Sequence, residues 1–316
     1  MDKTLTSVLA LSLSITATAA LAEWPDRPIT MIVPYNPGGT TDILARAAAD
    51  AIANALGQPV VVENRPGAGG VVGATQAAQA EGDGYTIFFA NNATQVVQPL
   101  INPAVSYDPQ ADFTGIATIA DAATILAVNA DLPIHSMADF VAYAGSHDMR
   151  FGTAGVGSMG QFITELTLMR TGTDATHIPY QGSNNAMAAV MSGEIDFMAD
   201  PVVATQAQDT HLRLIAALIP ERHPSLPDLP TAREEGYDVA ITGWFGLFAP
   251  DGIDPAYVQA MAAPLAALVD TDAYREQVLR MGLLPHYRSP EETNASVNGD
   301  LVTFAEIRDE AGISIE

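Results

Sequence analysis

The chain contains no cysteine. It therefore forms neither a disulfide nor a thiolate metal site, and a cysteine nucleophile is excluded. The six histidines, at positions 135, 147, 177, 211, 223 and 286, lack the HxH or HxxxH spacing of a metal site, so we expect neither a metal nor a cofactor. A chain without disulfides has to obtain its stability from its apolar cores.

Basic residues are scarce as well. Lys and Arg together number 13 against 37 Asp and Glu, which gives a formal net charge of −24. The only lysine is Lys3, so every other basic residue is an arginine. Such an acidic surface repels phosphate backbones, and nucleic acid is not an expected partner.

Long hydrophobic runs are absent except at the N-terminus, where Leu5 to Ala20 are mostly apolar. This run follows Lys3 and ends in Ala20-Leu21-Ala22, the small-x-small pattern typical of a signal peptidase site. We therefore predict a secretory signal peptide at residues 1–22, cleaved before Glu23. A membrane anchor is the alternative, but a spanning helix needs ~20 apolar residues.

Two repeats of strand, glycine turn and helix open the mature chain. The apolar run Ile29–Val33 leads into the turn Pro37–Gly39 and an alanine-rich helix. A second apolar strand at 60–62 precedes the glycine turn 64–70, and a third strand covers 85–90. This alternation predicts an α/β fold with a parallel sheet flanked by helices, whose ligands bind at the C-terminal ends of the strands.

A second α/β unit occupies the middle of the chain. Its expected strands cover residues 150–153, 175–180, 195–199 and 212–218, with helices at 161–169 and 185–192. An aromatic extended segment at 242–250 and helices within 255–281 and 290–311 follow. Because the middle unit interrupts the first, we expect domain I to comprise residues 23–121 and 246–316, domain II residues 122–245, and a cleft to lie between them.

The turn between the first strand and the first helix is a candidate anion site. Gly38 and Gly39 let a ligand approach the backbone closely, and Thr40, Thr41 and Asp42 offer side-chain caps to the helix. Unpaired N–H groups at a helix start, together with the helix dipole, bind anions. The turn has neither the Gly-Lys-Ser/Thr of a Walker loop nor GxGxxG, and a purely structural turn is the alternative.

The middle unit repeats this feature in the glycine turn 154–158. Two such turns facing one cleft would suit a ligand with carboxylate groups. Ser158 resembles a nucleophile elbow, but Val156 stands where GxSxG requires glycine. An exported hydrolase that uses Ser158 or an acid pair is therefore an alternative. Asp200, at the end of an apolar strand, is the best candidate for a functional acid, and holding a turn is its alternative role.

Several segments taken together resemble one family, the Bug (TctC-like) solute receptors of tripartite tricarboxylate transporters. The match runs in order through WPDRPI (24–29), PYNPGGTTD (34–42), VENRPGAGG (62–70), GVGS (155–158), PYQG (179–182), LPDLPT (226–231) and WFGLFAP (244–250). The resemblance implies a periplasmic-binding-protein fold of the type II-like class. In that fold two α/β domains, each a mixed, mainly parallel sheet flanked by helices, hold the ligand in the cleft between them.

The resemblance also implies a function and a set of contacts. It implies a non-enzymatic periplasmic receptor, monomeric, that delivers a small carboxylate to a membrane permease of one large and one small subunit. A ligand-presenting sensory receptor is a further alternative. Carried over by position, the expected ligand contacts are Tyr35, Asn36, Gly38, Gly39, Thr40, Thr41, Asn91, Thr153, Ala154, Gly155, Ser158, Gln161, Tyr180, Gln181 and Asp200.

Three of these positions depart from the family pattern. Gln161 stands where the family often has His, Gln181 where it often has Lys, and Asn36 where it often has Pro or Ala. Because two cationic groups are missing, the sequence favours a mono- or dicarboxylate over a tricarboxylate.

Overall fold

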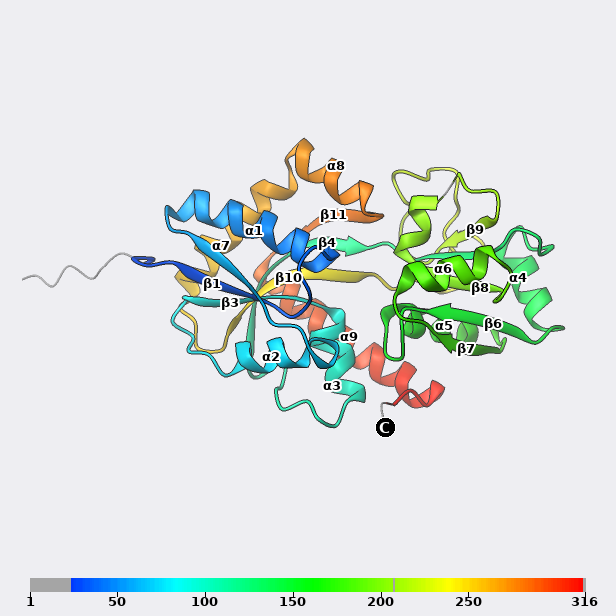
Figure 1. Ribbon diagram of the computed structural model, residues 1–316, viewed down its shortest axis with the longest axis horizontal. Helices are drawn as coiled ribbons and strands as arrows, with labels where there is room; N and C mark the ends of the chain where they lie inside the picture. The colour runs from blue at the N-terminus through cyan, green and yellow to red at the C-terminus, as the bar shows by residue number, and fades with distance from the viewer. Residues whose placement is uncertain (1–23, 207, 315–316) are drawn as a thin grey trace, which may run out of the picture.

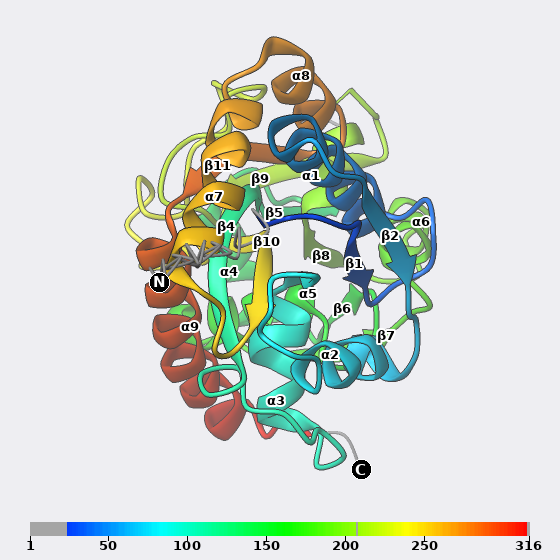
Figure 2. The same ribbon diagram turned by 90° about the vertical axis from the view of Figure 1, so that its left-hand side faces the viewer.

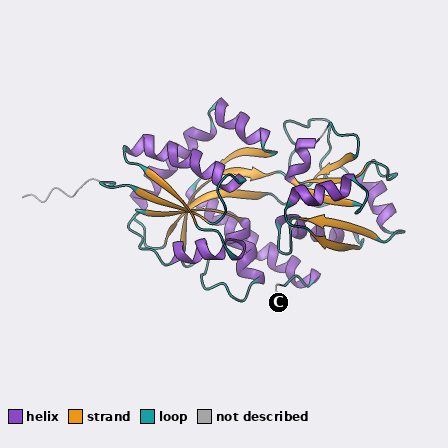
Figure 3. Cartoon of the chain, in the orientation of Figure 1, coloured by secondary structure: helices purple, strands orange, loops and turns teal. Residues whose placement is uncertain are grey.

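The computed structural model describes residues 24–206 and 208–314, and the predicted signal peptide at 1–22 lies outside this range. Two β-sheets, each flanked by helices, lie side by side (Figures 1 and 3). The strands are β1 Ile29–Val33, β2 Val60–Asn64, β3 Thr86–Asn91, β4 Phe113–Ala122, β5 Ile125–Asn129, β6 Met149–Thr153, β7 Ala175–Pro179, β8 Phe197–Asp200, β9 Leu212–Ala217, β10 Gly243–Pro250 and β11 Leu283–Arg288. The two-domain α/β fold predicted from the sequence is confirmed.

The helices are α1 Thr40–Leu56, α2 Val71–Ala78, α3 Gln98–Ile101, α4 Met137–Ala144, α5 Met159–Thr171, α6 Ser183–Met191, α7 Pro255–Val269, α8 Asp272–Arg280 and α9 Pro290–Ala311. Short 3-10 segments cover Ala68–Gly70 and Pro201–Gln206, and Ala93–Val97 is π-helical. None of the helices in the described part of the chain combines the length and the apolarity that a membrane crossing requires.

The first sheet has the strand order β11-β4-β10-β3-β1-β2. β1 pairs in parallel with β2 and β3, as the strand–turn–helix repeats predict, because each crossover helix returns the chain in the same direction. β10 then runs antiparallel between β3 and β4, which makes the sheet mixed. Helices α1, α7 and α8 pack on one face, and α2, α3 and α9 on the other (Figure 2).

The second sheet has the order β7-β6-β8-β5-β9, with β6 parallel to β7 and β8 and with β5 antiparallel to β8 and β9. Buried apolar side chains on both faces explain the short apolar runs of its strands. α6 packs on one face through Ala186 and Val190, and α5 on the other through Phe162.

Two connections carry the chain between the sheets, one at residues 123–124 and one at residues 218–242. β10 begins at Gly243, so Gly243, Trp244 and Phe245 pair within the first sheet, whereas the predicted boundary assigned them to the middle unit. The C-terminal helix α9 joins the two parts again, because Phe304 packs against Phe162 of α5 with ring centroids 5.2 Å apart.

Candidate ligand-binding turns at the domain interface

The first predicted turn joins β1 to α1 and is open to solvent. Residues 36–40 are exposed, and α1 starts after Gly39, its N-cap residue, without a side-chain cap from that residue. The first N–H groups of a helix have no intrahelical partner and lie at the positive end of the helix dipole. The start of α1 is directed towards the second domain (Figure 1), so these donors face the interface.

Asp42 closes the turn from inside the helix. Its Oδ2 accepts a hydrogen bond from the N–H of Gly38 at 2.9 Å. The sequence predicts Thr40, Thr41 and Asp42 as side-chain caps of the helix, but glycine occupies the N-cap position and Asp42 bonds to Gly38, which lies outside the helix. One donor of the turn, the Gly38 N–H, is thereby already used.

Tyr35 and Asn91 meet beside this turn. The Tyr35 hydroxyl donates to Oδ1 of Asn91 at 3.1 Å, and the same oxygen accepts from the N–H of Thr94 at 3.2 Å. Burial raises the pKa of Tyr35 to about 12. Tyr35 is therefore a neutral donor at any physiological pH.

The second predicted turn, residues 154–158, is held by its own hydrogen bonds. The hydroxyl of Thr153 accepts from the N–H of Gly155 at 3.2 Å, and Oε1 of Gln161 accepts from the N–H of Gly157 at 2.8 Å. The Ser158 hydroxyl accepts from the N–H of Gln161 at 3.4 Å as the N-cap of α5. Ser158 thus caps a helix in this structure, which gives the hydrolase alternative no support.

Asp200 lies beside this turn, at the end of β8. A Cβ built on Gly160 would lie 3.7 Å from Oδ2 of Asp200 and 4.0 Å from Oγ of Ser158, so the two side chains are neighbours. Asp200 accepts from the Ser183 hydroxyl at 2.7 Å and from the N–H of Val202 at 2.9 Å. Burial raises the pKa of Asp200, although both hydrogen bonds act in the opposite direction.

Tyr180 and Gln181, two further predicted contacts, do not lie beside Asp200 in the same way: one hydroxyl is engaged elsewhere and the other side chain is exposed. The Tyr180 hydroxyl donates to Oε1 of Glu194, a residue of the turn that precedes β8, at 2.9 Å. This hydroxyl is therefore engaged at the other end of the sheet from Asp200. Gln181 and Asn36 have exposed side chains, which remain available to a ligand.

The segment from Asn92 to Ile101 lies between the glycine turn at 64–70 and the second predicted turn at 154–158. A side chain at Gly157 would collide with Ile101, and a side chain at Gly69 would collide with Gln98. The sequence predicts a strand at 85–90 and no helix directly after it, whereas Ala93–Val97 and Gln98–Ile101 are helical. The apolar spacing of Val96, Val97, Leu100 and Ile101 was the available signal, since it is helical.

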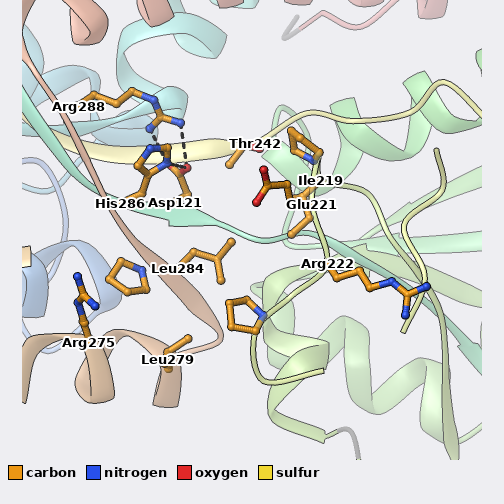
Figure 4. A pocket seen from close by; sticks show the side chains of 13 residues that line it. Asp121, Ile219, Glu221, Arg222, Thr242, Arg275, Leu279, Leu284, His286 and Arg288 are labelled. Atoms are coloured by element: carbon orange, nitrogen blue, oxygen red, sulfur yellow. Dashed lines mark hydrogen bonds and ion pairs between the residues drawn. The ribbon is translucent and has the colours of Figure 1, made fainter. Parts of the chain in front are cut away.

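A cavity of about 660 Å³ lies elsewhere, between β11, α8 and the loop at 219–224 (Figure 4). Asp121 on its wall accepts from Arg288 and from Nδ1 of His286, while Glu221 projects from the opposite side. The arginines that line it are already paired: Arg288 with Asp121, Arg222 with Glu234 and Arg275 with Asp270. The cavity is therefore no obvious carboxylate site.

Within residues 24–206 and 208–314, no group of three or more His, Asp or Glu side chains is placed to hold a metal ion. The chemistry of the two turns is accordingly that of backbone N–H groups, hydroxyls and amides. Such a set binds an anion without a cationic side chain.

Comparison with known proteins agrees with this geometry. Residues 44–312 match the model of the tripartite tricarboxylate transporter family receptor, TctC. Protein BugT of Bordetella pertussis is 31% identical over 324 residues, covering 99% of both chains. A solved R. palustris protein with adipate is 30% identical, with a TM-score of 0.79 over 92% of this chain and 99% of that one.

A second solved structure, MatC from Rhodopseudomonas palustris with bound malate, is 30% identical, with a TM-score of 0.74 over 90% of this chain and 99% of that one. The likeness thus covers both sheets and every segment of the candidate site. The chain belongs to the TctC family of tripartite tricarboxylate transporter receptors.

Proposed function

We propose that this chain is a periplasmic receptor that captures a mono- or dicarboxylate between its two turns and delivers it to a membrane permease of one large and one small subunit. The observation that carries the proposal is the start of α1, where residues 36–40 are exposed and the helix is directed towards the second domain. Family membership supports the receptor role. The relatives solved with adipate and malate support a small carboxylate.

The side chains around the turns support a ligand of low charge. Gln161 and Gln181 are uncharged, and Asp200 adds an acid beside the second turn. None of the fifteen predicted contacts is a cation. A third carboxylate of a tricarboxylate would therefore lie near acids and amides without a compensating charge.

Titration calorimetry with adipate, malate, succinate, acetate and citrate tests the proposal. We expect one-to-one binding of at least one mono- or dicarboxylate in the micromolar range, about 8 kcal/mol. Citrate should bind about tenfold more weakly or worse, since its third charge stays uncompensated. Tightest binding of citrate would overturn the low-charge preference, and absence of heat and of thermal shift with every acid would overturn the carboxylate receptor itself.

Closure of the two domains around the ligand is part of the proposal. In the first sheet β1 and β11 lie on opposite sides of β4 and β10, and in the second sheet β6 and β9 lie on opposite sides of β5. The turns and the 660 Å³ cavity thus lie on opposite sides of the strands that join the domains. A hinge motion at these strands that brings the two turns together must therefore widen the cavity.

Leu279→Trp is therefore expected to tighten ligand binding about three- to tenfold, because a larger side chain in the cavity opposes its narrowing and favours the closed form. Affinity for the best acid of the calorimetric panel measures the effect. Glu276→Trp, on the exposed face of the same helix, is the control and should leave affinity unchanged. Weaker binding by a folded Leu279→Trp variant would contradict a hinge at β4, β5 and β10.

A further inference from the structure

The buried carboxylate of Asp42 is the centre of a network that joins both ends of the first turn. It is 3% exposed and accepts from Gly38 N–H at 2.9 Å, from Arg46 Nε and Nη2 at 2.9 and 3.0 Å, and from Asn64 Nδ2 at 2.8 Å. Asn64 Nδ2 also donates to the carbonyl oxygen of Tyr35 at 3.0 Å. The network therefore fixes the turn where it leaves β1 and where it enters α1.

The second turn is built in the same way with a neutral side chain. Gly38 and Gly157 both have positive φ, +83° and +74°, and each precedes the N-cap residue of its helix. The N–H of each donates to a side chain four residues later, to Asp42 in one turn and to Gln161 in the other. The position thus requires an acceptor oxygen and does not require a charge.

The charge of Asp42 nevertheless has to be balanced. Burial alone would raise the pKa of Asp42, but the hydrogen bonds from Arg46, Gly38 and Asn64 outweigh it and lower the pKa to about 2. An ionised carboxylate therefore lies in the first turn of α1, where a ligand anion would also bind. Arg46 forms an ion pair with it across one helical turn and neutralises it.

We propose that Asp42, Asn64 and Arg46 are positioning residues of the ligand site: Asp42 and Asn64 set the turn so that N–H groups beyond Gly38 face the ligand, and Arg46 cancels the charge that would repel it. The inference rests on the proposed carboxylate function. It predicts that Arg46, which is half exposed and is not one of the predicted ligand contacts, influences ligand affinity.

A double-mutant cycle of Asp42→Asn and Arg46→Gln tests the charge balance by calorimetry with the best-binding acid. Arg46→Gln alone should weaken binding about tenfold at low salt and less at high salt, where the exposed charges are screened. Asp42→Asn alone should bind at least as tightly as the wild type, because the amide oxygen still accepts from Gly38 and the unopposed charge of Arg46 attracts the ligand. Arg46→Gln added to Asp42→Asn should return affinity to within about threefold of the wild type, since the site again carries no net charge.

Asp42→Ala tests the positioning role, with a readout that needs no ligand. It should weaken binding about thirtyfold or more and shift the amide proton resonance of Gly38, which Asp42→Asn leaves near its wild-type position. Arg280→Gln removes an exposed pair of the same i,i+4 spacing, with Glu276 on α8, and should leave affinity within about twofold.

A double variant that binds as weakly as Arg46→Gln alone, or unchanged affinity and an unchanged Gly38 resonance in Asp42→Ala, would overturn the inference. Failure of the wild type to bind any acid would instead overturn the carboxylate function, and the Gly38 resonance would still test the network. If Asp42→Ala does not fold, the half-exposed Arg46 and the isosteric Asp42→Asn keep the cycle measurable.

Discussion

Gly39→Val is expected to reduce ligand affinity at least about 100-fold while leaving the fold intact. Gly39 has φ −78° and ψ 169°, a conformation that any residue adopts. A Cβ there would meet only the carbonyl oxygen of Asn36, at 3.7 Å, so the branched side chain would point into open space. That space is the approach to the first N–H groups of α1.

The expected size follows from the contacts that the side chain would block. Each hydrogen bond to a charged group contributes about 1.5–3 kcal/mol, and the loss of two such bonds corresponds to about 3 kcal/mol or more, a factor of at least about 100. Calorimetry with the best-binding acid measures affinity, and thermal melting of the unliganded protein measures stability. Gly39→Ala, with a smaller side chain, should give an intermediate loss.

Two comparisons make this prediction specific. A Cβ at Gly299, on the open surface of α9, meets nothing within 4 Å, so Gly299→Val should leave binding unchanged. Arg65→Gln removes an exposed guanidinium that pairs with Glu63 at 2.7 Å and should cost far less than Gly39→Val. Equal losses from Arg65→Gln and Gly39→Val would mean that side-chain charge, not the backbone of the turn, holds the ligand.

The strand–turn–helix repeats could be predicted because their signals are local. The apolar run of β1 is followed at once by Pro37 and two glycines, and no other regular structure accommodates that order. The place of β10 could not be predicted in this way. Phe248 pairs with Phe88, and a partner 160 residues away depends on the packing of both domains rather than on either segment. β11, with Pro285 in its middle, was missed because proline weakens the strand pattern.

The positions of the two turns could be predicted from their glycines and from the strand ends. The hydrogen bonds within the turns were not predicted. Capping rules place an acid or amide at the third helical position, and Asp42 and Gln161 both stand there. This signal could have shown that the N–H groups of Gly38 and Gly157 are used internally. The engagement of the Tyr180 hydroxyl with Glu194 had no comparable signal, because it depends on how the side chain lies on the sheet.

Asp300 is expected to make the protein less stable at pH 8 than at pH 5. This carboxylate on α9 accepts, through one oxygen, from Nδ2 of Asn92 at 2.7 Å and from Nε1 of Trp244 at 2.8 Å. Burial raises the pKa of Asp300 to about 6, although these bonds and the charge of Arg288 lower it in part. The native protein therefore keeps a proton that the unfolded chain, with a pKa near 3.9, releases.

The sign follows from proton binding. Between about pH 4 and pH 6 the native state binds more protons than the unfolded state, so the free energy of unfolding falls as pH rises through this window. A shift of about two units corresponds to at most about 3 kcal/mol, and partial solvent exposure reduces this to about 2 kcal/mol. Glu165, whose pKa burial and the charge of Asp174 raise to about 7, acts in the same direction up to that pH.

Asp300→Asn isolates the contribution of this one group. Both donors bond to the same oxygen of Asp300, and an amide oxygen can accept both without ionising. We expect the variant to match the wild type near pH 4 and to exceed its free energy of unfolding by about 2 kcal/mol at pH 8. Urea unfolding at one-unit steps from pH 4 to pH 8 measures the difference.

The control is Glu306→Gln, which neutralises an exposed carboxylate on the same helix. It should change the free energy of unfolding little at every pH, because an exposed side chain has much the same surroundings in the native and unfolded states. Below pH 4 the low pKa of Asp42, about 2, acts in the opposite direction, since protonation there removes a stabilising ion pair. Stability should therefore be greatest near pH 4 to 5, and a wild type most stable at pH 8 would contradict the assignment of a buried, proton-holding Asp300.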